Sequence, residues 1–205
     1  TLEFVPLMFI LQQGFEKYRT LDAQSESFPY KLPLMFLLAS SVWNFVGAGV
    51  LGFFINVPAI NYFEHGTYLT VAHSHAATFG AFGLLALGLG TYILRVVTPE
   101  EAWEPGWFRG TFWLTNVGIG VMTVFSLLPL GFKQLRSVYE EGYATARSPE
   151  FYERPENQRW LWARSLGDAP MILGALAFTT GAVRLLLATG RDRRNEEPAT
   201  AGGNA

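Results

Sequence analysis

The sequence contains no cysteine, which excludes disulfide bonds, thiolate metal sites, iron–sulfur clusters and a cysteine nucleophile. Charge is also scarce, because 16% of the 205 residues are charged, whereas about a quarter carry charge in an ordinary soluble domain. The 15 basic and 17 acidic residues nearly cancel, so we expect no nucleic-acid partner. Hydrophobic residues make up 50% of the chain, which indicates a protein that folds in lipid.

The sequence contains long apolar runs without charged residues. Three stretches, 32–63, 66–94 and 110–132, contain no Asp, Glu, Lys or Arg. Each is longer than the ~20 residues that cross a ~30 Å hydrocarbon core as a helix. Backbone groups in lipid must be satisfied within the segment, so we expect helices and not strands. With two further apolar stretches near the termini, the sequence predicts an all-α polytopic membrane bundle of about five transmembrane helices.

The predicted helices occupy residues 2–18, 33–58, 66–97, 107–132 and 159–188, and the fourth has a helical composition as far as 146. They form a transmembrane region over 1–190, followed by a polar tail, 191–205, that we expect to be disordered. Five crossings put the loops 59–66 and 133–158 on one side of the membrane. The other side of the membrane, which includes the C-terminus, carries more Lys and Arg. Because cytoplasmic loops are enriched in these residues, we expect the C-terminus to be cytoplasmic. The chain starts inside an apolar run, so we expect it to be part of something longer.

Three histidines lie within eleven residues, at His65, His73 and His75. On a regular helix His73 and His75 point about 200° apart, so they cannot bind one metal ion together. A histidine in lipid is costly unless it is paired, and neutral imidazole is the usual axial ligand of haem iron. The pattern therefore favours one helix between two haems. The alternatives are interhelical hydrogen bonds or a water-filled proton path.

The predicted last helix carries charge inside it. Asp168 follows Arg164 by one helical turn, which favours a local ion pair. The alternative for Asp168 is a proton-relay carboxylate, because an acid inside a membrane is costly without a function.

Several motifs resemble a known family. They are Trp-Asn-Phe-Val-Gly-Ala-Gly at 43–49, Phe-Ile-Asn-Val-Pro at 54–58 and Thr-Val-Ala-His-Ser-His-Ala-Ala-Thr-Phe-Gly at 70–80. The likeness continues through 126–129 and 142–148 to Gly-Asp at 167–168. Together they resemble the C-terminal part of the catalytic subunit of bacterial nitric oxide reductases, in the haem–copper oxidase superfamily. The resemblance covers almost the whole chain except the tail.

The resemblance implies roles for four residues. His73 corresponds to the proximal ligand of the high-spin haem b, and His75 to one axial ligand of the low-spin haem b. His65 corresponds to a histidine near the haem propionates, or it is a solvated loop residue. Glu3, in Leu-Glu-x-x-Pro-Leu, corresponds to a glutamate beside the non-haem iron that tunes the metal or relays protons; the alternative is an ordinary interfacial carboxylate.

The chain also departs from the family pattern. The family binds its non-haem iron with three histidines and a glutamate on earlier helices and takes the low-spin haem's other ligand from there, and this sequence has no histidine left for them. We therefore expect a partner, the N-terminal part of the same subunit. The sequence also has His-Ser-His where the reductases have His-Gly-His.

The implied activity is reduction of nitric oxide to nitrous oxide in the bacterial inner membrane, as part of respiration and denitrification. The implied partners are membrane lipid, quinol or cytochrome c as electron donor, and a small haem c subunit. A terminal oxygen reductase of the same superfamily is the first alternative. A non-catalytic membrane anchor, with two haems or none, is the second.

Overall fold

The computed structural model describes residues 4–24 and 28–196, and all regular structure in this part of the chain is helical. The predicted all-α fold is therefore confirmed. In chain order the elements are α1 (Phe4–Gln24), α2 (Lys31–Trp43), η1 (Asn44–Leu51), α3 (Gly52–Asn56), α4 (Pro58–Glu64), α5 (Tyr68–His75), η2 (Ala76–Gly83), α6 (Leu84–Val97), η3 (Glu100–Ala102), α7 (Pro105–Met122), η4 (Thr123–Leu127), α8 (Leu128–Glu141), α9 (Tyr143–Ala146), α10 (Pro149–Glu153), α11 (Pro155–Ala163) and α12 (Ser165–Glu196).

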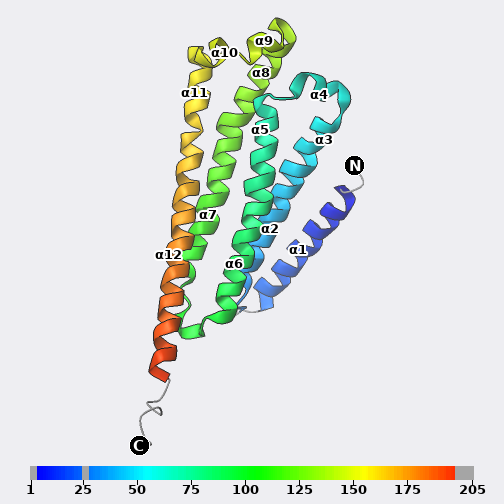
Figure 1. Cartoon of the computed structure of the whole chain (residues 1–205). Coiled ribbons are helices and arrows are strands. Elements are labelled where there is room, and N and C mark those ends of the chain that lie inside the picture. Colours follow the sequence, from blue (N-terminus) through cyan, green and yellow to red (C-terminus); the bar gives the residue numbers. More distant parts are fainter. Residues whose placement is uncertain (1–3, 25–27, 197–205) are drawn as a thin grey trace, which may run out of the picture.

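The elements join end to end into long antiparallel passes (Figure 1). From the N-terminal end, α1 runs down, α2 to α3 run up, α5 to α6 run down, α7 to α8 run up, and α11 to α12 run down. The short helices α4, α9 and α10 lie at the upper end, whereas η3 lies at the lower end with the C-terminal end of α12. The loops 59–66 and 133–158 therefore share one end of the bundle, as the sequence predicts.

Within residues 4–24 and 28–196, four passes are long and apolar enough to cross a membrane. They are Lys31–Asn56, Tyr68–Val97, Pro105–Glu141 and Pro155–Gly190. The expected fifth crossing corresponds to α1, which is not among the four. The middle of α1 carries Gln12 and Gln13, which each donate a side-chain hydrogen bond to the exposed carboxylate of Glu16. The last helix continues to Glu196, inside the predicted tail, and 197–205 lie outside the described residues.

Three consecutive passes contain a π-helical stretch in their middle: η1, η2 and η4. The sequence analysis did not predict these stretches. A π-helical turn holds an additional residue and occurs frequently at functional sites. Here η1 and η2 touch backbone to backbone, because a Cβ on Gly47 would lie 2.7 Å from the carbonyl carbon of Ala76. This contact brings η1 against the helix that carries His73 and His75.

The fourth and fifth passes pack closely through glycine. A Cβ on Gly118 of α7 would lie 2.7 Å from the carbonyl oxygen of Gly167 in α12, and a Cβ on Gly167 would lie 2.6 Å from that of Gly118. Small residues at a membrane interface let helix backbones approach each other. The two helices accordingly lie side by side along much of their length (Figure 1).

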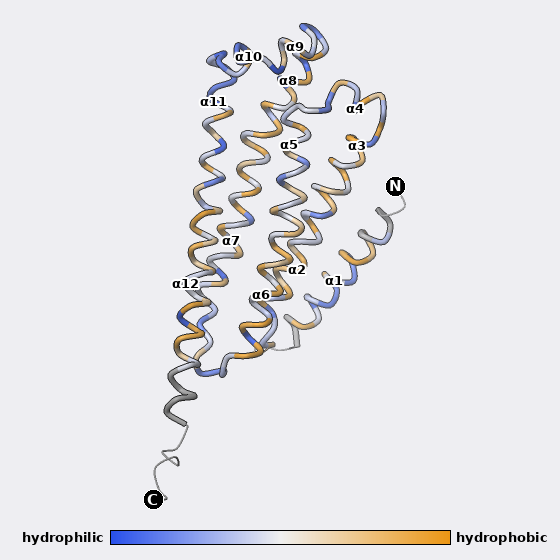
Figure 2. Tube along the Cα trace, in the orientation of Figure 1, coloured by the Kyte–Doolittle hydropathy of each residue, from blue (hydrophilic) through white to orange (hydrophobic). Residues whose placement is uncertain are grey.

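The outer surface of the bundle is largely apolar. Figure 2 shows hydrophobic positions along the passes and more hydrophilic ones in the turns at either end. Large side chains with more than half of their surface exposed include Phe82, Ile93, Trp113, Phe125 and Leu187. An apolar exterior of this extent fits contact with lipid or with further helices.

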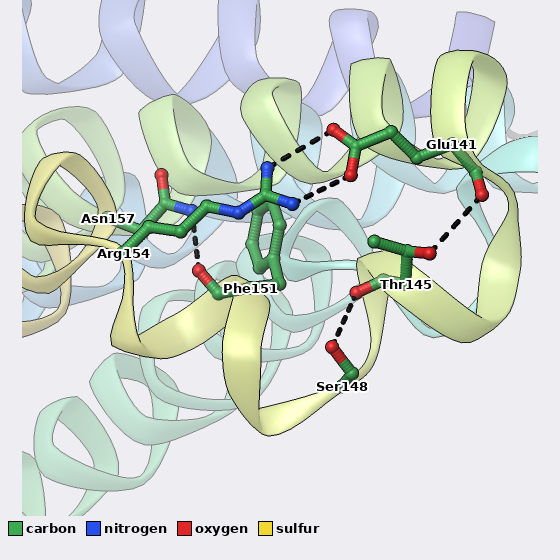
Figure 3. A network of polar contacts seen from close by, with 6 residues as sticks. All are labelled: Glu141, Thr145, Ser148, Phe151, Arg154 and Asn157. Atoms are coloured by element: carbon green, nitrogen blue, oxygen red, sulfur yellow. Dashed lines mark hydrogen bonds and ion pairs between the residues drawn. The ribbon is translucent and has the colours of Figure 1, made fainter.

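The segment after α8 has structure of its own, because it contains α9 and α10. The fourth pass ends at Glu141 because Gly142 takes a positive φ of 89°, a conformation that favours glycine. Arg154 closes the turn by pairing both of its terminal nitrogens with Glu141, at 3.1 and 2.7 Å (Figure 3). This hydrogen-bonded carboxylate raises the pKa of the Arg154 guanidinium above its usual value.

Further bonds hold the same turn, and Figure 3 shows them. The Asn157 amide donates to the carbonyl of Phe151 at 2.7 Å, and the Ser148 hydroxyl donates to the carbonyl of Thr145 at 3.0 Å. Asn157 and Phe151 are both about 2% exposed. This polar segment therefore contains two short helices, α9 and α10, which lie at the upper end of the bundle.

Candidate functional site

The His73 and His75 side chains contact different parts of the bundle. Both residues lie in the last turn of α5, directly before η2. His73 faces η1, where its Nδ1 lies 2.7 Å from the carbonyl oxygen of Gly47. His75 faces the opposite neighbour, and its Nε2 lies 3.2 Å from a terminal nitrogen of Arg164, between α11 and α12. The structure therefore keeps the two imidazoles apart, as the helical spacing predicts.

Both rings lie within hydrogen-bond distance of a backbone carbonyl through Nδ1. A carbonyl oxygen only accepts hydrogen bonds, so Nδ1 of His73 carries the proton when it bonds Gly47. Nδ1 of His75 bonds the carbonyl of Val71 at 2.9 Å in the same way. Each ring then presents the lone pair of Nε2, the arrangement that protein sites use to orient a metal-binding imidazole. The residues present therefore fit an axial ligand on each face of α5.

Glycine leaves room for the first of these rings. A Cβ on Gly52 would lie 3.1 Å from Cε1 of His73 and 3.5 Å from its Nδ1. A larger side chain at position 52 would press on the imidazole. Gly47 and Gly52, both in the second half of the second pass, thus fix the place of His73.

A cavity adjoins the second ring. Its volume is about 620 Å³, within the range of small-molecule and cofactor sites. It lies between the third pass and α7 with α12, and most of its wall is apolar. The lining residues are His75, Phe79, Gly83, Ala86, Leu87, Thr115, Met122, Arg164, Asp168, Met171, Ile172 and Ala175.

Arg164 and Asp168 form the ion pair that their spacing predicts. Arg164 Nε lies 3.2 Å from Asp168 Oδ2, and both side chains line the cavity beside His75. The pair is partly accessible, with 40% and 41% of the side chains exposed. The contact between Arg164 and His75 joins residues 89 positions apart in sequence, and no local pattern signals it.

His65 lies apart from the other two histidines. It follows α4 at the upper end of the bundle, is exposed, and lines an open cavity of about 480 Å³ together with Tyr143 and Arg147. Its carbonyl oxygen accepts a bond from the Arg147 guanidinium. Glu3 lies outside the described residues, so its proposed place near an iron site stays a prediction.

Glu64 is a buried acid that the sequence analysis did not single out. It is 2% exposed, and its Oε1 accepts a bond from the Thr70 hydroxyl at 3.0 Å. Within the part of the chain that the structure describes, no group donates to its Oε2. Glu64 lies next to His65 in a predicted loop, and nothing in the local sequence indicates that it is buried.

The Gln134 side chain links α5, the helix that carries His73 and His75, to the segment after α8. The side chain is fully buried, and its Oε1 accepts from the backbone N–H of Tyr68 at 2.8 Å. Its amide nitrogen donates to the carbonyl of Ala146 at 2.8 Å and to the hydroxyl of Tyr152 at 2.9 Å. One side chain therefore satisfies groups from α5, α9 and α10.

We expect Gln134→Leu to lower the free energy of unfolding by about 2–4 kcal/mol, because a buried polar group left without a partner costs ~1–3 kcal/mol. Denaturation in detergent, followed by circular dichroism, measures this change. Arg136→Leu is the matched control on α8, since Arg136 makes an exposed pair with Glu140. Equal stability of the two variants contradicts a structural role for Gln134.

A polytopic helix bundle with two histidines that face different neighbours from one helix is the class of structure observed here, a helical membrane protein. The comparisons name the family. A family model described as cytochrome c and quinol oxidase polypeptide I matches residues 1–169. The chain belongs to this family of haem-containing membrane oxidoreductases, and it is a multi-pass membrane protein.

Two curated relatives are similar to about half of the chain. A nitric oxide reductase subunit of Stutzerimonas stutzeri is 32% identical over 101 residues, which are 47% of this chain and 21% of the relative. Cytochrome c oxidase polypeptide 1 of Halobacterium salinarum is 31% identical over 100 residues, which are 49% of this chain and 16% of the relative. The chain thus aligns with about a fifth of the length of each relative or less.

Proposed function

We propose that this chain is the part of a nitric oxide reductase catalytic subunit that holds both haems, the low-spin haem b through His75 and the high-spin haem b through His73. The observation that carries the proposal is the shared bonding pattern of the two rings. Each Nδ1 bonds a backbone carbonyl and each Nε2 is presented on a different face of α5. The similarity to the nitric oxide reductase subunit of S. stutzeri supports the substrate.

When bound, the haems supply electron transfer and, with a non-haem iron, the reduction of two nitric oxide molecules to nitrous oxide and water. The chain's own contribution is positional. Gly47 and Val71 fix the two imidazoles on one short helix, so the distance between the two cofactor sites is set by a rigid element. Most of the wall of the cavity beside His75, where a porphyrin would lie, is apolar.

Further helices of the same subunit complete the proposed site. They supply the histidines and the glutamate of the non-haem iron and the second axial ligand of the low-spin haem, with Glu3 beside that iron. His65 lies near the propionates. The proposed setting is the bacterial inner membrane with a cytoplasmic C-terminus, and the electron donor is quinol or cytochrome c, the latter through a small haem c subunit.

An oxygen reductase is the second candidate, because the oxidase polypeptide of H. salinarum is similar over an equal share of the chain. Metal analysis of the complex purified with its partner helices separates the two. A nitric oxide reductase contains more iron than haem and no copper, and it consumes nitric oxide in an electrode assay. Copper stoichiometric with haem contradicts the proposal and supports an oxidase. A folded preparation without haem supports a membrane anchor.

A further inference from the structure

A further cavity opens at the lower end of the bundle, away from both paired histidines, and is called the lower cavity below. Its volume is about 360 Å³, and its wall is largely apolar. The lining residues are Glu104, Gly106, Trp107, Gly110 and Ala177. All except Ala177 lie at or directly before the start of α7, and Ala177 lies on α12. Because the membrane-spanning pass begins at Pro105, the lower cavity lies at the boundary between lipid and water.

Glycine keeps the floor of the lower cavity open. A Cβ built on Gly106 or on Gly110 meets nothing within 4 Å. The packing beside them is the opposite, because a Cβ on Gly181 of α12 would lie 2.7 Å from the Cβ of Trp107. Gly106 and Gly110 therefore do not serve the close contact between α7 and α12. They leave space on the outer surface of α7, next to the Trp107 ring.

The acidic side chain of the lower cavity already has a counter-ion. Glu104 accepts a bond from the Trp107 indole at 3.1 Å and another from the Arg184 guanidinium at 3.3 Å. The guanidinium also lies over the Trp107 ring, 5.9 Å from its centroid. The pair of Glu104 with Arg184 is therefore neutral, and it does not repel an anion from the lower cavity.

Arg109 adds a positive charge beside the lower cavity. It is exposed, and none of the side chains that the structure describes forms an ion pair or a hydrogen bond with it. At 3.6 residues per turn, Arg109 lies about 60° around α7 from Gly106, on the side away from Trp107. Helical side chains lean toward the N-terminus of their helix, and α7 starts at the lower end. The guanidinium is thus directed toward the membrane surface.

An anionic phospholipid presents its groups in the same order as the lower cavity. Ala177 lies seven residues before Arg184 on α12, which places the apolar wall about 10 Å deeper in the membrane than the charged side chains. An acyl chain fits the deeper part, and a phosphate fits the level of Arg109. Basic pockets between membrane helices bind anionic headgroups, and tryptophan is enriched at this depth.

We propose that the lower cavity binds one anionic phospholipid of the surrounding bilayer, with its phosphate on Arg109 and an acyl chain across Gly106 and Gly110. Arg184 takes no new partner in this arrangement, because it stays paired with Glu104. The lipid site goes beyond the proposed haem-binding function and does not depend on it.

The test is lipid binding to the purified chain in detergent, measured by native mass spectrometry with phosphatidylglycerol and phosphatidylcholine as probes. The unmodified chain is expected to bind one phosphatidylglycerol about fivefold more tightly than phosphatidylcholine, the effect of one basic residue near a membrane surface. Arg109→Gln is expected to remove this preference and to leave the binding of phosphatidylcholine unchanged. Arg136→Gln is the matched control, since it removes the same charge from an exposed position on α8.

A second variant tests the cavity itself. Gly110→Leu fills the lower cavity from a position whose Cβ meets no other atom of the protein, so we expect the fold to persist and the affinity for both lipids to fall. Gly120→Leu is the control, because its Cβ is equally free but does not line the lower cavity. Circular dichroism measures the fold of each variant. If Gly110→Leu does not fold, Gly106→Leu takes its place with the same expectation.

Each contrary result overturns the proposal. Equal affinity of the unmodified chain for the two lipids, or equal loss of affinity in Arg109→Gln and Arg136→Gln, shows that Arg109 selects no headgroup. Displacement of phosphatidylglycerol by inorganic phosphate shows that the occupant is a free anion. Unchanged binding in Gly110→Leu places the lipid elsewhere on the chain. Loss of the lipid when the chain assembles with its partner helices shows that protein covers the lower cavity.

Discussion

Replacement of His75 by Ala is expected to remove the spectrum of the low-spin haem and to leave the high-spin haem largely in place. The reason is the separation of the two rings. His75 bonds Val71 and Arg164, whereas His73 bonds Gly47 across the opposite helix interface, so the loss of one ring leaves the other in position. Optical and electron paramagnetic resonance spectra of the complex with its partner helices measure both haems separately.

Ser74→Ala is the control for the His75 variant. Ser74 lies between the two histidines, is exposed, and donates to the backbone of its own helix at 2.9 Å, so its removal is expected to change neither spectrum. His73→Ala is expected to give the reciprocal result, with loss of the high-spin signal. Loss of neither signal, or equal loss of both in each variant, contradicts the assignment of one haem to each ring.

Substitution of Gly118 by Ala is expected to destabilise the bundle, by about 1–3 kcal/mol as in overpacked cores. The added methyl group would lie 2.7 Å from the carbonyl oxygen of Gly167 and 3.1 Å from the backbone nitrogen of Met171. Backbone atoms cannot rotate out of the way as a side chain can, so α7 and α12 must separate. Denaturation in detergent measures the loss of stability.

Gly120→Ala provides a matched control for Gly118→Ala. Gly120 lies on the same helix two residues later, and a Cβ there meets nothing within 4 Å. Its replacement is expected to leave stability unchanged. The Gly118 variant is also expected to weaken haem binding at His75, because Met122 and Met171 line the cavity at this helix interface. Equal stability of the two alanine variants contradicts close contact between α7 and α12.

The parts of the fold that could be predicted depend on local information. The uncharged stretches 32–63, 66–94 and 110–132 each exceed a membrane thickness, and each is a long pass of the structure. The ion pair of Arg164 with Asp168 follows from their spacing on one helix, and the structure confirms it. The divergence of His73 and His75 follows in the same way from helical geometry.

The parts that could not be predicted depend on contacts between distant segments. The π-helical stretches lie inside continuous apolar runs, where hydropathy does not distinguish one helical geometry from another. The bonds from His73 to Gly47 and from Arg164 to His75 join residues 26 and 89 positions apart. The burial of Glu64 and Gln134 depends on how the upper turn folds over α5, which composition alone does not determine.

The central claim is that two imidazoles on one helix bind two different haem irons. An experimental density map of the complex assembled with its partner helices tests it most directly. The account predicts two porphyrins on opposite faces of α5, with one iron at ligation distance from Nε2 of His73 and another from Nε2 of His75. Density at either nitrogen that contains only packed side chains or water, in a complex with full haem content, contradicts the account.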